Sequence, residues 1–398
     1  MTEPVDASNE FAKMASGALD HASHAGVANA YGQLQQKCPV QRMSMPDGST
    51  YWAVLGSAEL ESVLKDHVTF SSAIVHFGDM PSIPIELDPP RHTHYRRILN
   101  AVLTPAVVKS VEEHYRRYVV EMLTALIAEG GGNVVPGAKA LPLRMLCRIL
   151  GVPDEEWKSL QMTQTDLVPR DMISDQNNAA TDRLAGLVPV LEYAMKLIQQ
   201  RRAAPADDVV SKLLASNVDG VPITDQEALQ MMMLLLLAGH ETTGNALSGC
   251  VLLLAQYSDV QQSLRDNPEK IATAVEEILR TEAPVQTLDR ITTRDTEIAG
   301  QKIAAGDKLL TLFAAANSDK CVFAEPEKFD PARTPNRHYT FGRGIHTCVG
   351  AAFARMELRV FIEELLSRTQ SLTVRDGFTR DRWPVLGLTR LDVAVVAK

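Results

Sequence analysis

The amino-acid sequence predicts a mainly α-helical protein with small β-sheets, folded as a single domain over residues 1–398. Apolar residues recur with a helical period along most of the chain, and segments that alternate like strands are few. Turn-forming stretches are short, and neither a linker nor a repeat divides the chain. Residues 1–30 carry no diagnostic pattern and are expected to form an N-terminal arm.

Each expected element follows from its local pattern. Apolar residues at every third or fourth position predict helices at 57–66, 91–103, 105–129, 154–166, 180–202, 223–256, 268–282 and 350–367. Pro89-Pro90 precedes one helix and Pro105 begins another, positions at which helices accept proline. Alternating and β-branched residues predict strands at 51–55, 290–299, 308–312 and 391–397. The helix at 223–256 would be about 50 Å long, so we expect it to cross the core.

Composition narrows the class of protein. A net charge of −9 and a pI near 5.6 argue against nucleic acid as a partner. The longest apolar run, Met231–Gly239, is far shorter than the roughly 20 residues of a membrane span. The N-terminus lacks the apolar segment of a signal peptide, and the 5 scattered cysteines indicate reduced thiols. We therefore expect a cytoplasmic protein that binds neither nucleic acid nor membrane.

One cysteine, Cys348, has an unusual setting in the run FGRGIHTCVG. The amphipathic pattern after it places Cys348 at a helix N-terminus, where backbone amides and the helix dipole lower the pKa of a thiol. Three glycines of the run let a flat group approach the backbone: Gly342, Gly344 and Gly350. These residues alone permit a structural cysteine, a thiolate ligand of haem iron, or a nucleophile with His346 as a weak base.

The spacing Phe-x-x-Gly-x-x-x-Cys-x-Gly resembles the haem-binding signature of the cytochrome P450 family. The resemblance implies the P450 fold, in which a long central helix lies over a haem b held by a cysteine loop. It also implies that the Cys348 thiolate is the axial ligand of the haem iron. Other residues of the loop that would contact the cofactor are Phe341, Gly342 and Gly350.

A second motif, AGHETT, lies in the central helix and is similar to the oxygen-activation motif of the family. Here an acid and a hydroxyl follow nine apolar residues, and buried charge is costly without a partner or a task. The Thr242 hydroxyl can bond the carbonyl of Ala238, four residues back. The resemblance implies that Thr242 and Glu241 are catalytic in proton delivery, that Ala238 and Gly239 lie beside the cofactor, and that Gly239 leaves room for a small molecule. The residues alone also allow Glu241 to pair with His240 or a distant arginine, and any role of His240 stays open.

Two further sets of residues match the family in order along the chain. Glu277-x-x-Arg280 and Arg333 would form a structural triad that supports the cysteine loop, because residues three apart share a helix face. The haem propionates would be bound by four basic residues: His92, Arg96, Arg290 and His346.

The resemblance implies a monooxygenase that uses O2 to oxidise a hydrophobic small molecule, and a monomer. The chain has no flavin or iron–sulfur motif, so electrons would come from a separate ferredoxin-type protein. We expect the substrate pocket at Ile74, Val75, Phe77, Leu234, Leu237, Val285, Leu288 and Leu386. Cations for the electron donor are expected at Arg97, Arg343 and Arg355.

Other activities of a haem-thiolate protein are also considered. A peroxygenase or an isomerase of the same fold is possible, but the intact Glu241–Thr242 pair argues against it. A haem-based sensor or binding protein would be expected to carry an output domain, which this sequence lacks. A helical protein without haem, in which Cys348 is structural, would be colourless.

Overall fold

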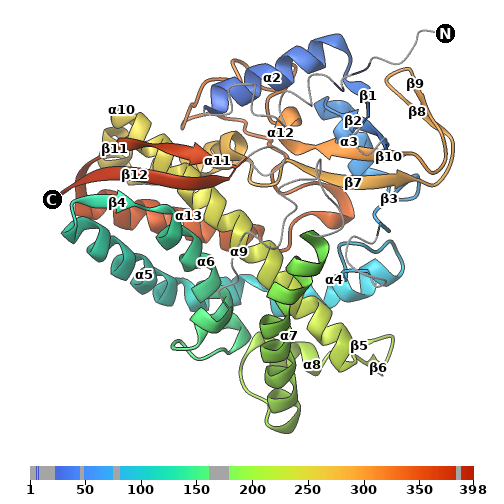
Figure 1. The fold of residues 1–398 in the computed structure, drawn as a ribbon, viewed down its shortest axis with the longest axis horizontal. Coiled ribbons are helices and arrows are strands. Elements are labelled where there is room, and N and C mark those ends of the chain that lie inside the picture. Colours follow the sequence, from blue (N-terminus) through green and yellow to red (C-terminus); the bar gives the residue numbers. More distant parts are fainter. Residues whose placement is uncertain are drawn as a thin grey trace.

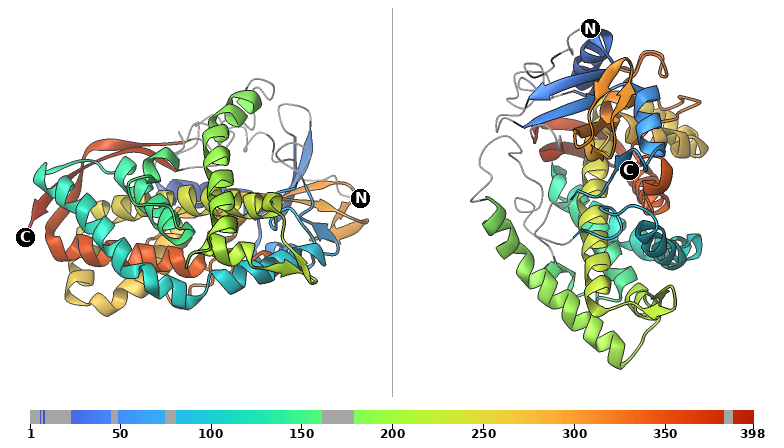
Figure 2. Two further views of the ribbon diagram at one scale, coloured as in Figure 1. Left: turned by 90° about the horizontal axis from the view of Figure 1, so that it is seen from below. Right: turned by 90° about the vertical axis from the view of Figure 1, so that its right-hand side faces the viewer.

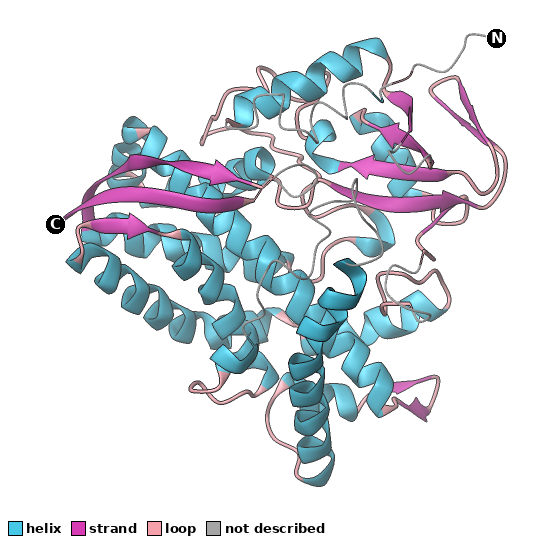
Figure 3. Cartoon of the chain, in the orientation of Figure 1, coloured by secondary structure: helices cyan, strands magenta, loops and turns pink. Residues whose placement is uncertain are grey.

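The computed structural model describes residues 6, 8, 23–44, 49–74, 81–160, 179–381 and 387–398, without the side chains of 179–186. In this part of the chain, most of the helices and a small antiparallel sheet lie on one side of the molecule, and a mixed sheet with the remaining helices lies on the other (Figures 1 and 3). The long helix α9 (Asp225–Gln256) runs through the helical side toward that sheet (Figure 1). The predicted mainly α architecture with small sheets is therefore present.

Most helices share one large apolar core with α9. They are α4 (Arg91–Val102), α5 (Pro105–Ala128), α6 (Val135–Leu150), α7 (Ala179–Ala203), α8 (Val209–Leu214), α10 (Ser258–Asp266), α11 (Ile271–Glu282) and α13 (Ala351–Arg368). The helices α2 (His24–Lys37), α3 (Ser57–Lys65) and α12 (Phe313–Ala316) instead belong to two smaller apolar cores beside the mixed sheet. Short 3₁₀ helices occupy Trp157–Leu160, Pro268–Lys270 and Gly344–His346. The helix α7 crosses α9 on the outside of this core (Figure 2).

The start and the middle of α9 show why it can serve as the central helix. A capping box begins it: the Glu227 N–H donates to the Thr224 hydroxyl, and the Thr224 N–H donates to the Glu227 carboxylate at 2.7 Å. Most later residues are buried, and the helix packs against α6, α11 and α13. Gly244 permits the close crossing with α6, because a Cβ there would lie 2.9 Å from the Lys139 Cα. The helix is therefore held along its length.

Among the described residues, the strands form two larger sheets and two hairpins. The five-stranded sheet has the order β1-β2-β10-β7-β3, with β2 and β10 parallel and the other pairs antiparallel. Its strands are β1 (Val40–Ser44), β2 (Thr50–Val54), β3 (Phe70–Ser71), β7 (Thr287–Thr292) and β10 (Lys308–Leu312). The other sheet is formed by β11 (Thr369–Arg380), β12 (Leu388–Ala397) and β4 (Gly131–Asn133). The hairpins are β5 (Asn217–Val218) with β6 (Val221–Pro222), and β8 (Thr296–Ile298) with β9 (Gln301–Ile303).

The helix predicted at 154–166 is wrong over its described part. Residues 154–156 form a turn and Trp157–Leu160 forms a 3₁₀ helix, while the rest lies outside the described residues. The backbone closes here over three residues instead of four, since the Glu156 N–H donates to the Pro153 carbonyl at 3.0 Å.

The single strand predicted at 290–299 is also wrong. The strand β7 ends at Thr292 and β8 begins at Thr296. Between them the Thr293 N–H donates to the Thr69 carbonyl at 2.9 Å, which extends the β3–β7 pairing by one residue, and the chain bends at Thr293 and Arg294 before β8 begins. The other predicted helices and strands are present, with ends that differ by three residues or fewer.

In the described ranges, no helix combines the length and the hydropathy that crossing a lipid bilayer requires. All five cysteines lie within these ranges and are free thiols. The predicted absence of a disulfide framework is thus confirmed.

We predict that Leu247→Ala in α9 lowers the free energy of unfolding by about 2–5 kcal/mol, because it leaves a cavity in a closely packed core. Leu247 has 0% exposure, and neighbouring residues of α9 are also buried. Urea unfolding followed by circular dichroism measures the loss. The matched control is Val221→Ala at a side chain with 67% exposure, which we expect to change stability by about 0.5 kcal/mol or less. Equal losses in the two variants would contradict the packing described here.

Candidate functional site

The Cys348 loop is fixed by its backbone before the start of α13. The Cys348 N–H donates to the Phe341 carbonyl at 2.8 Å, which closes the loop around the 3₁₀ helix Gly344–His346. Gly344 has φ +72°, and a Cβ there would lie 2.3 Å from the Leu64 carbonyl oxygen at the end of α3. A glycine is therefore required at this position for both conformation and space. The predicted helix start after Cys348 is present, since α13 begins at Ala351.

The environment of the Cys348 thiol differs from the prediction. The residue is accessible to solvent, yet the surrounding protein desolvates its sulfur and raises its pKa above the ordinary value. Backbone amides of Gly350 and Ala351 and the charge of Arg96 lower the pKa, but by less than burial raises it. The expectation of a lowered pKa is thus wrong for the unligated thiol. A coordinated metal ion would deprotonate it.

A histidine of α4 lies against a histidine of the cysteine loop. His92 of α4 has 2% exposure, and its ring centroid is 4.3 Å from that of His346. Burial, followed by the charge of Arg290 and then His92, lowers the pKa of His346 to about 3, so both rings are neutral at physiological pH. Both ring nitrogens of His92 and the Nε2 of His346 have no hydrogen-bond partner among the described residues. Buried, unsatisfied polar atoms of this kind point to an absent ligand.

Two arginines complete this basic cluster. Arg96, one turn after His92 on α4, donates from Nη2 to the Thr347 carbonyl. Arg290 of β7 has 7% exposure and donates to the Asp289 carbonyl at 2.6 Å, but it makes no ion pair within the described ranges. Burial lowers the pKa of both guanidinium groups, which nevertheless remain charged. The four predicted propionate-binding residues therefore come together as a positive, incompletely satisfied cluster.

The AGHETT segment is more accessible to solvent than the rest of the middle of α9. Ala238 is exposed, and Glu241 and Thr242 are partly accessible, although neighbouring residues along the helix are buried. The Thr242 hydroxyl donates to the Ala238 carbonyl at 2.7 Å, as predicted from their spacing. One side of the central helix thus presents a small residue, a hydroxyl and a carboxyl group at an accessible surface.

The opposite side of this segment packs against α6. A Cβ on Gly239 would lie 3.0 Å from Leu146, so the glycine serves the packing of α9 on α6, and the room for a small molecule expected at Gly239 stays a prediction. Its small size lets the two helices approach. His240 is buried beside Lys139, where burial and then the Lys139 charge lower its pKa to about 4.

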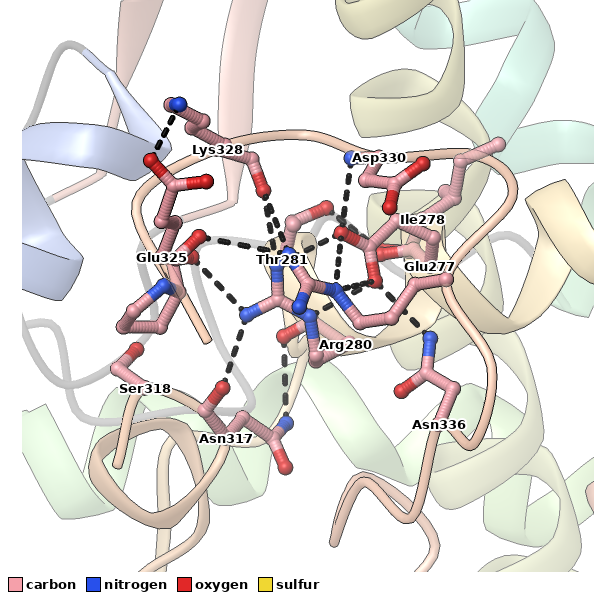
Figure 4. A network of polar contacts seen from close by, with 12 residues as sticks. Glu277, Ile278, Arg280, Thr281, Asn317, Ser318, Glu325, Lys328, Asp330 and Asn336 are labelled. Carbon is pink, nitrogen blue, oxygen red and sulfur yellow. Dashed lines mark hydrogen bonds and ion pairs between the residues drawn. The ribbon is translucent and has the colours of Figure 1, made fainter. Parts of the chain in front are cut away.

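Glu277 is the centre of a buried polar network (Figure 4). Its carboxylate has 0% side-chain exposure and accepts hydrogen bonds from Arg280 at 2.7 and 2.8 Å and from Arg333 at 3.1 and 3.2 Å. The Asp330 N–H and the Asn336 amide also donate to it, at 3.0 and 2.9 Å. The predicted triad therefore exists as an ion-paired group with additional donors.

Asn317 joins this network to the cysteine loop, and the sequence analysis missed it. It accepts a hydrogen bond from the Arg280 guanidinium through its carbonyl, and its side chain accepts one from the Tyr339 N–H at 2.6 Å. The amide of Asn317 also donates to the Thr340 hydroxyl at 3.0 Å. An asparagine in a loop carries no pattern that would reveal these contacts.

The structure describes five of the eight residues predicted for the substrate pocket. Apolar side chains expected in the substrate pocket are partly accessible at Ile74, Leu234, Leu237, Val285 and Leu288. The other three, Val75, Phe77 and Leu386, lie outside the described residues.

The three arginines expected to meet an electron donor differ in their contacts. Arg97 is exposed and makes no hydrogen bond or ion pair with the described residues. Arg343 donates to the carbonyls of Gly342 and His338, at 3.2 and 3.0 Å. Arg355 forms a two-pronged ion pair with a carboxylate of α11. Of the three, only Arg355 has its charge paired with a carboxylate among the described residues, and Arg97 is the one that makes no polar contact with them.

Comparison with known proteins decides the family. The sequence pattern of the family described as cytochrome P450 matches residues 160–382. The chain belongs to the cytochrome P450 family. Cytochrome P450 130 of Mycobacterium tuberculosis is 34% identical to it over 87% of this chain and 89% of the relative. Linalool 8-monooxygenase of Pseudomonas putida is 32% identical over 92% of this chain and 95% of that enzyme.

Solved P450 structures show the same fold. CYP108D1 of Novosphingobium aromaticivorans superposes with a TM-score of 0.83 at 29% identity, covering 97% of this chain and 99% of that one. The predicted family and fold are confirmed, and the chain is a P450 monooxygenase, an oxidoreductase that binds haem. The described residues fit this cofactor, because unsatisfied nitrogens of His92 and His346 and the buried charge of Arg290 suit its carboxylates.

We predict that Glu277→Gln lowers the free energy of unfolding of this P450 by about 3–5 kcal/mol, since it leaves the buried Arg280 guanidinium without its counter-ion. Urea unfolding measures the change. The control is Glu297→Gln, because Glu297 is exposed on β8. A Glu277→Gln variant as stable as the control would show that the network does not hold the loop.

We also predict a specific pH dependence for His240. Its pKa is about 4 in the folded P450 and about 6.5 in an unfolded chain, so the unfolded state binds the additional proton between these values. The free energy of unfolding therefore falls as pH decreases through this window, by up to about 3 kcal/mol from this group. In His240→Asn this part of the loss disappears. Parallel curves for the two proteins between pH 6.5 and 4 would contradict the burial of a neutral imidazole.

Proposed function

We propose that this P450 inserts an oxygen atom from O2 into a hydrophobic, largely uncharged small molecule. Cys348 would bind the iron of a haem b cofactor as a thiolate, and the electrons would come from a separate ferredoxin-type protein. The observation that carries the proposal is the basic cluster beside the Cys348 loop, in which buried nitrogens of His92 and His346 lack partners among the described residues. That pattern suits a cofactor with two carboxylates next to a thiolate ligand.

Each part of the site has a task in holding the cofactor. Bound haem with a thiolate ligand supplies the activation of dioxygen. Cys348 provides the sulfur ligand, and the loop residues Phe341, Gly342 and Gly350 pack against the macrocycle. The propionates are bound by His92, Arg96, Arg290 and His346. Ala238, which is exposed on α9, is small enough to leave space beside a bound haem.

On α9, Thr242 positions a proton donor and Glu241 exchanges protons with solvent. The Thr242 hydroxyl donates to the Ala238 carbonyl, so its oxygen lone pairs remain able to accept a proton donor. A water or an acidic group held at this oxygen is then fixed in position. Glu241 is the adjacent carboxyl group and is partly accessible, so it can exchange protons with solvent.

The class of substrate and the charge of the electron donor are inferred from two sets of accessible side chains. Partly accessible Leu234, Leu237, Val285 and Leu288 favour an apolar substrate, and the similarity to a linalool monooxygenase supports this class. The electron donor is an acidic protein that contacts the exposed Arg97. We further propose that the protein is a single-domain, cytoplasmic monomer.

We predict that Thr242→Ala uncouples oxygen consumption from product formation, because Thr242 positions the proton donor. The holoenzyme is supplied with a ferredoxin, its reductase and NADPH, and with a hydrophobic compound selected by its shift of the haem spin state. Product per NADPH should fall by about tenfold or more. The control Thr242→Ser keeps the hydroxyl and should retain most coupling.

Three outcomes would contradict the proposed function. If Thr242→Ala forms product as efficiently as the unaltered enzyme, Thr242 does not manage the proton. If the unaltered enzyme forms product only with hydrogen peroxide, the chain is a peroxygenase. Absence of any product with either electrons or peroxide, despite binding of carbon monoxide, would favour a sensor.

A further inference from the structure

A second ion-paired group lies next to the Glu277 network and involves Glu276, the preceding residue of α11. Arg355 of α13 donates to Glu276 from Nε at 2.7 Å and from Nη2 at 2.8 Å, so the pair is two-pronged. The buried imidazole of His338 contacts the same carboxylate through Nε2 at 3.2 Å. Adjacent residues of a helix point about 100° apart, so α11 directs its two acids to separate sets of partners.

The carboxylate of Glu276 is ionised in this arrangement. Burial alone would raise its pKa, but hydrogen bonds from Arg355 and His338 lower it to about 2. Its side chain has 27% exposure and that of Arg355 has 44%. The ion pair therefore lies at the edge of the protein, where its two-pronged geometry and its neighbours matter more than its charge alone.

Both partners of Glu276 reach the aromatic residue of the cysteine loop. The Arg355 guanidinium carbon lies 4.5 Å from the centroid of the Phe341 ring, and the His338 ring lies 5.9 Å from it at 51°. Planar guanidinium groups pack favourably on aromatic faces. The carbonyl of Phe341 in turn accepts the Cys348 N–H at 2.8 Å. A continuous set of contacts thus leads from Glu276 to the backbone of Cys348.

We propose that Glu276, His338 and Arg355 form a clamp that positions Phe341 and the Cys348 loop for haem binding, and that Arg355 does not serve as a docking cation for the electron donor. This inference rests on the proposed ligation of haem iron by Cys348. Arg355 has its charge compensated by Glu276 and its guanidinium stacked on Phe341. Arg97, by contrast, is exposed and makes no ion pair with the described residues.

The test compares two variants of the clamp in the purified holoenzyme. Glu276→Gln keeps the shape of the side chain and removes its charge. Arg355→Lys keeps the positive charge but loses the two-pronged geometry and the planar stacking. If Glu276→Gln yields no folded protein, Arg355→Lys alone is used for the comparison. The matched control is Glu269→Gln, because Glu269 is an exposed acid just before α11.

Haem transfer to apomyoglobin is the main readout, and the Soret band of the reduced carbon monoxide complex is the second. Loss of residues that orient a metal ligand typically weakens metal binding by about 10–100-fold. We therefore expect both clamp variants to transfer haem at least about tenfold faster than the unaltered protein. A larger share of their carbon monoxide complex should also lack the thiolate-type band. Glu269→Gln should match the unaltered protein in both measurements.

A docking role for Arg355 predicts a different pattern. Arg355→Lys would then bind haem and accept electrons from ferredoxin as the unaltered protein does, and Arg355→Gln would slow only that reduction. This pattern, or normal haem transfer and normal spectra in both clamp variants, would overturn the proposal. If the unaltered protein itself lacked the thiolate-type band, the proposed function would fail with it. The two failures are therefore distinguishable.

Discussion

The buried carboxylate of Glu277 is the constraint on which the position of the haem-binding loop depends. Removing a charge from water costs several kcal/mol, which only a complete set of partners can offset. Glu277 has such a set, because two arginines, an amide side chain and a backbone N–H donate to it. Through Asn317 the same network holds the backbone at Tyr339, just before the loop. The hydrogen bonds to the Glu277 carboxylate therefore fix the irregular segment that leads from Asn317 to the cysteine loop.

Three further features fix the cysteine loop. The end of α3 approaches Gly344 so closely that no side chain fits there. The Phe341 carbonyl receives the Cys348 N–H, and α13 begins directly after the loop. On the other side of the site, α9 is buried along most of its length and accessible at the AGHETT segment. A rigid frame thus surrounds a small region where polar atoms remain available, which is the arrangement that an enzyme requires for a cofactor and a substrate.

Several features could be predicted from the sequence because they are local. The period of apolar residues located α9, and the spacing around Cys348 identified the family. The helices α2 and α6 and the long strand β11 were missed. In α6 the residues Pro136, Gly137 and Pro142 read as helix breakers, although the helix continues through Pro142 within the core. The burial that raises the pKa of Cys348 and the packing of Gly239 against α6 both depend on neighbours that are distant in sequence. No local pattern could therefore predict them.

The central claim is that Cys348 binds haem iron as a thiolate, and one measurement tests it most directly. The absorption spectrum of the purified protein is recorded after reduction and addition of carbon monoxide. The account predicts a strongly red-shifted Soret band, because a thiolate ligand would donate electron density to the iron. A band at the position typical of histidine or neutral thiol ligation, or no haem band in protein produced with ample haem, would contradict it.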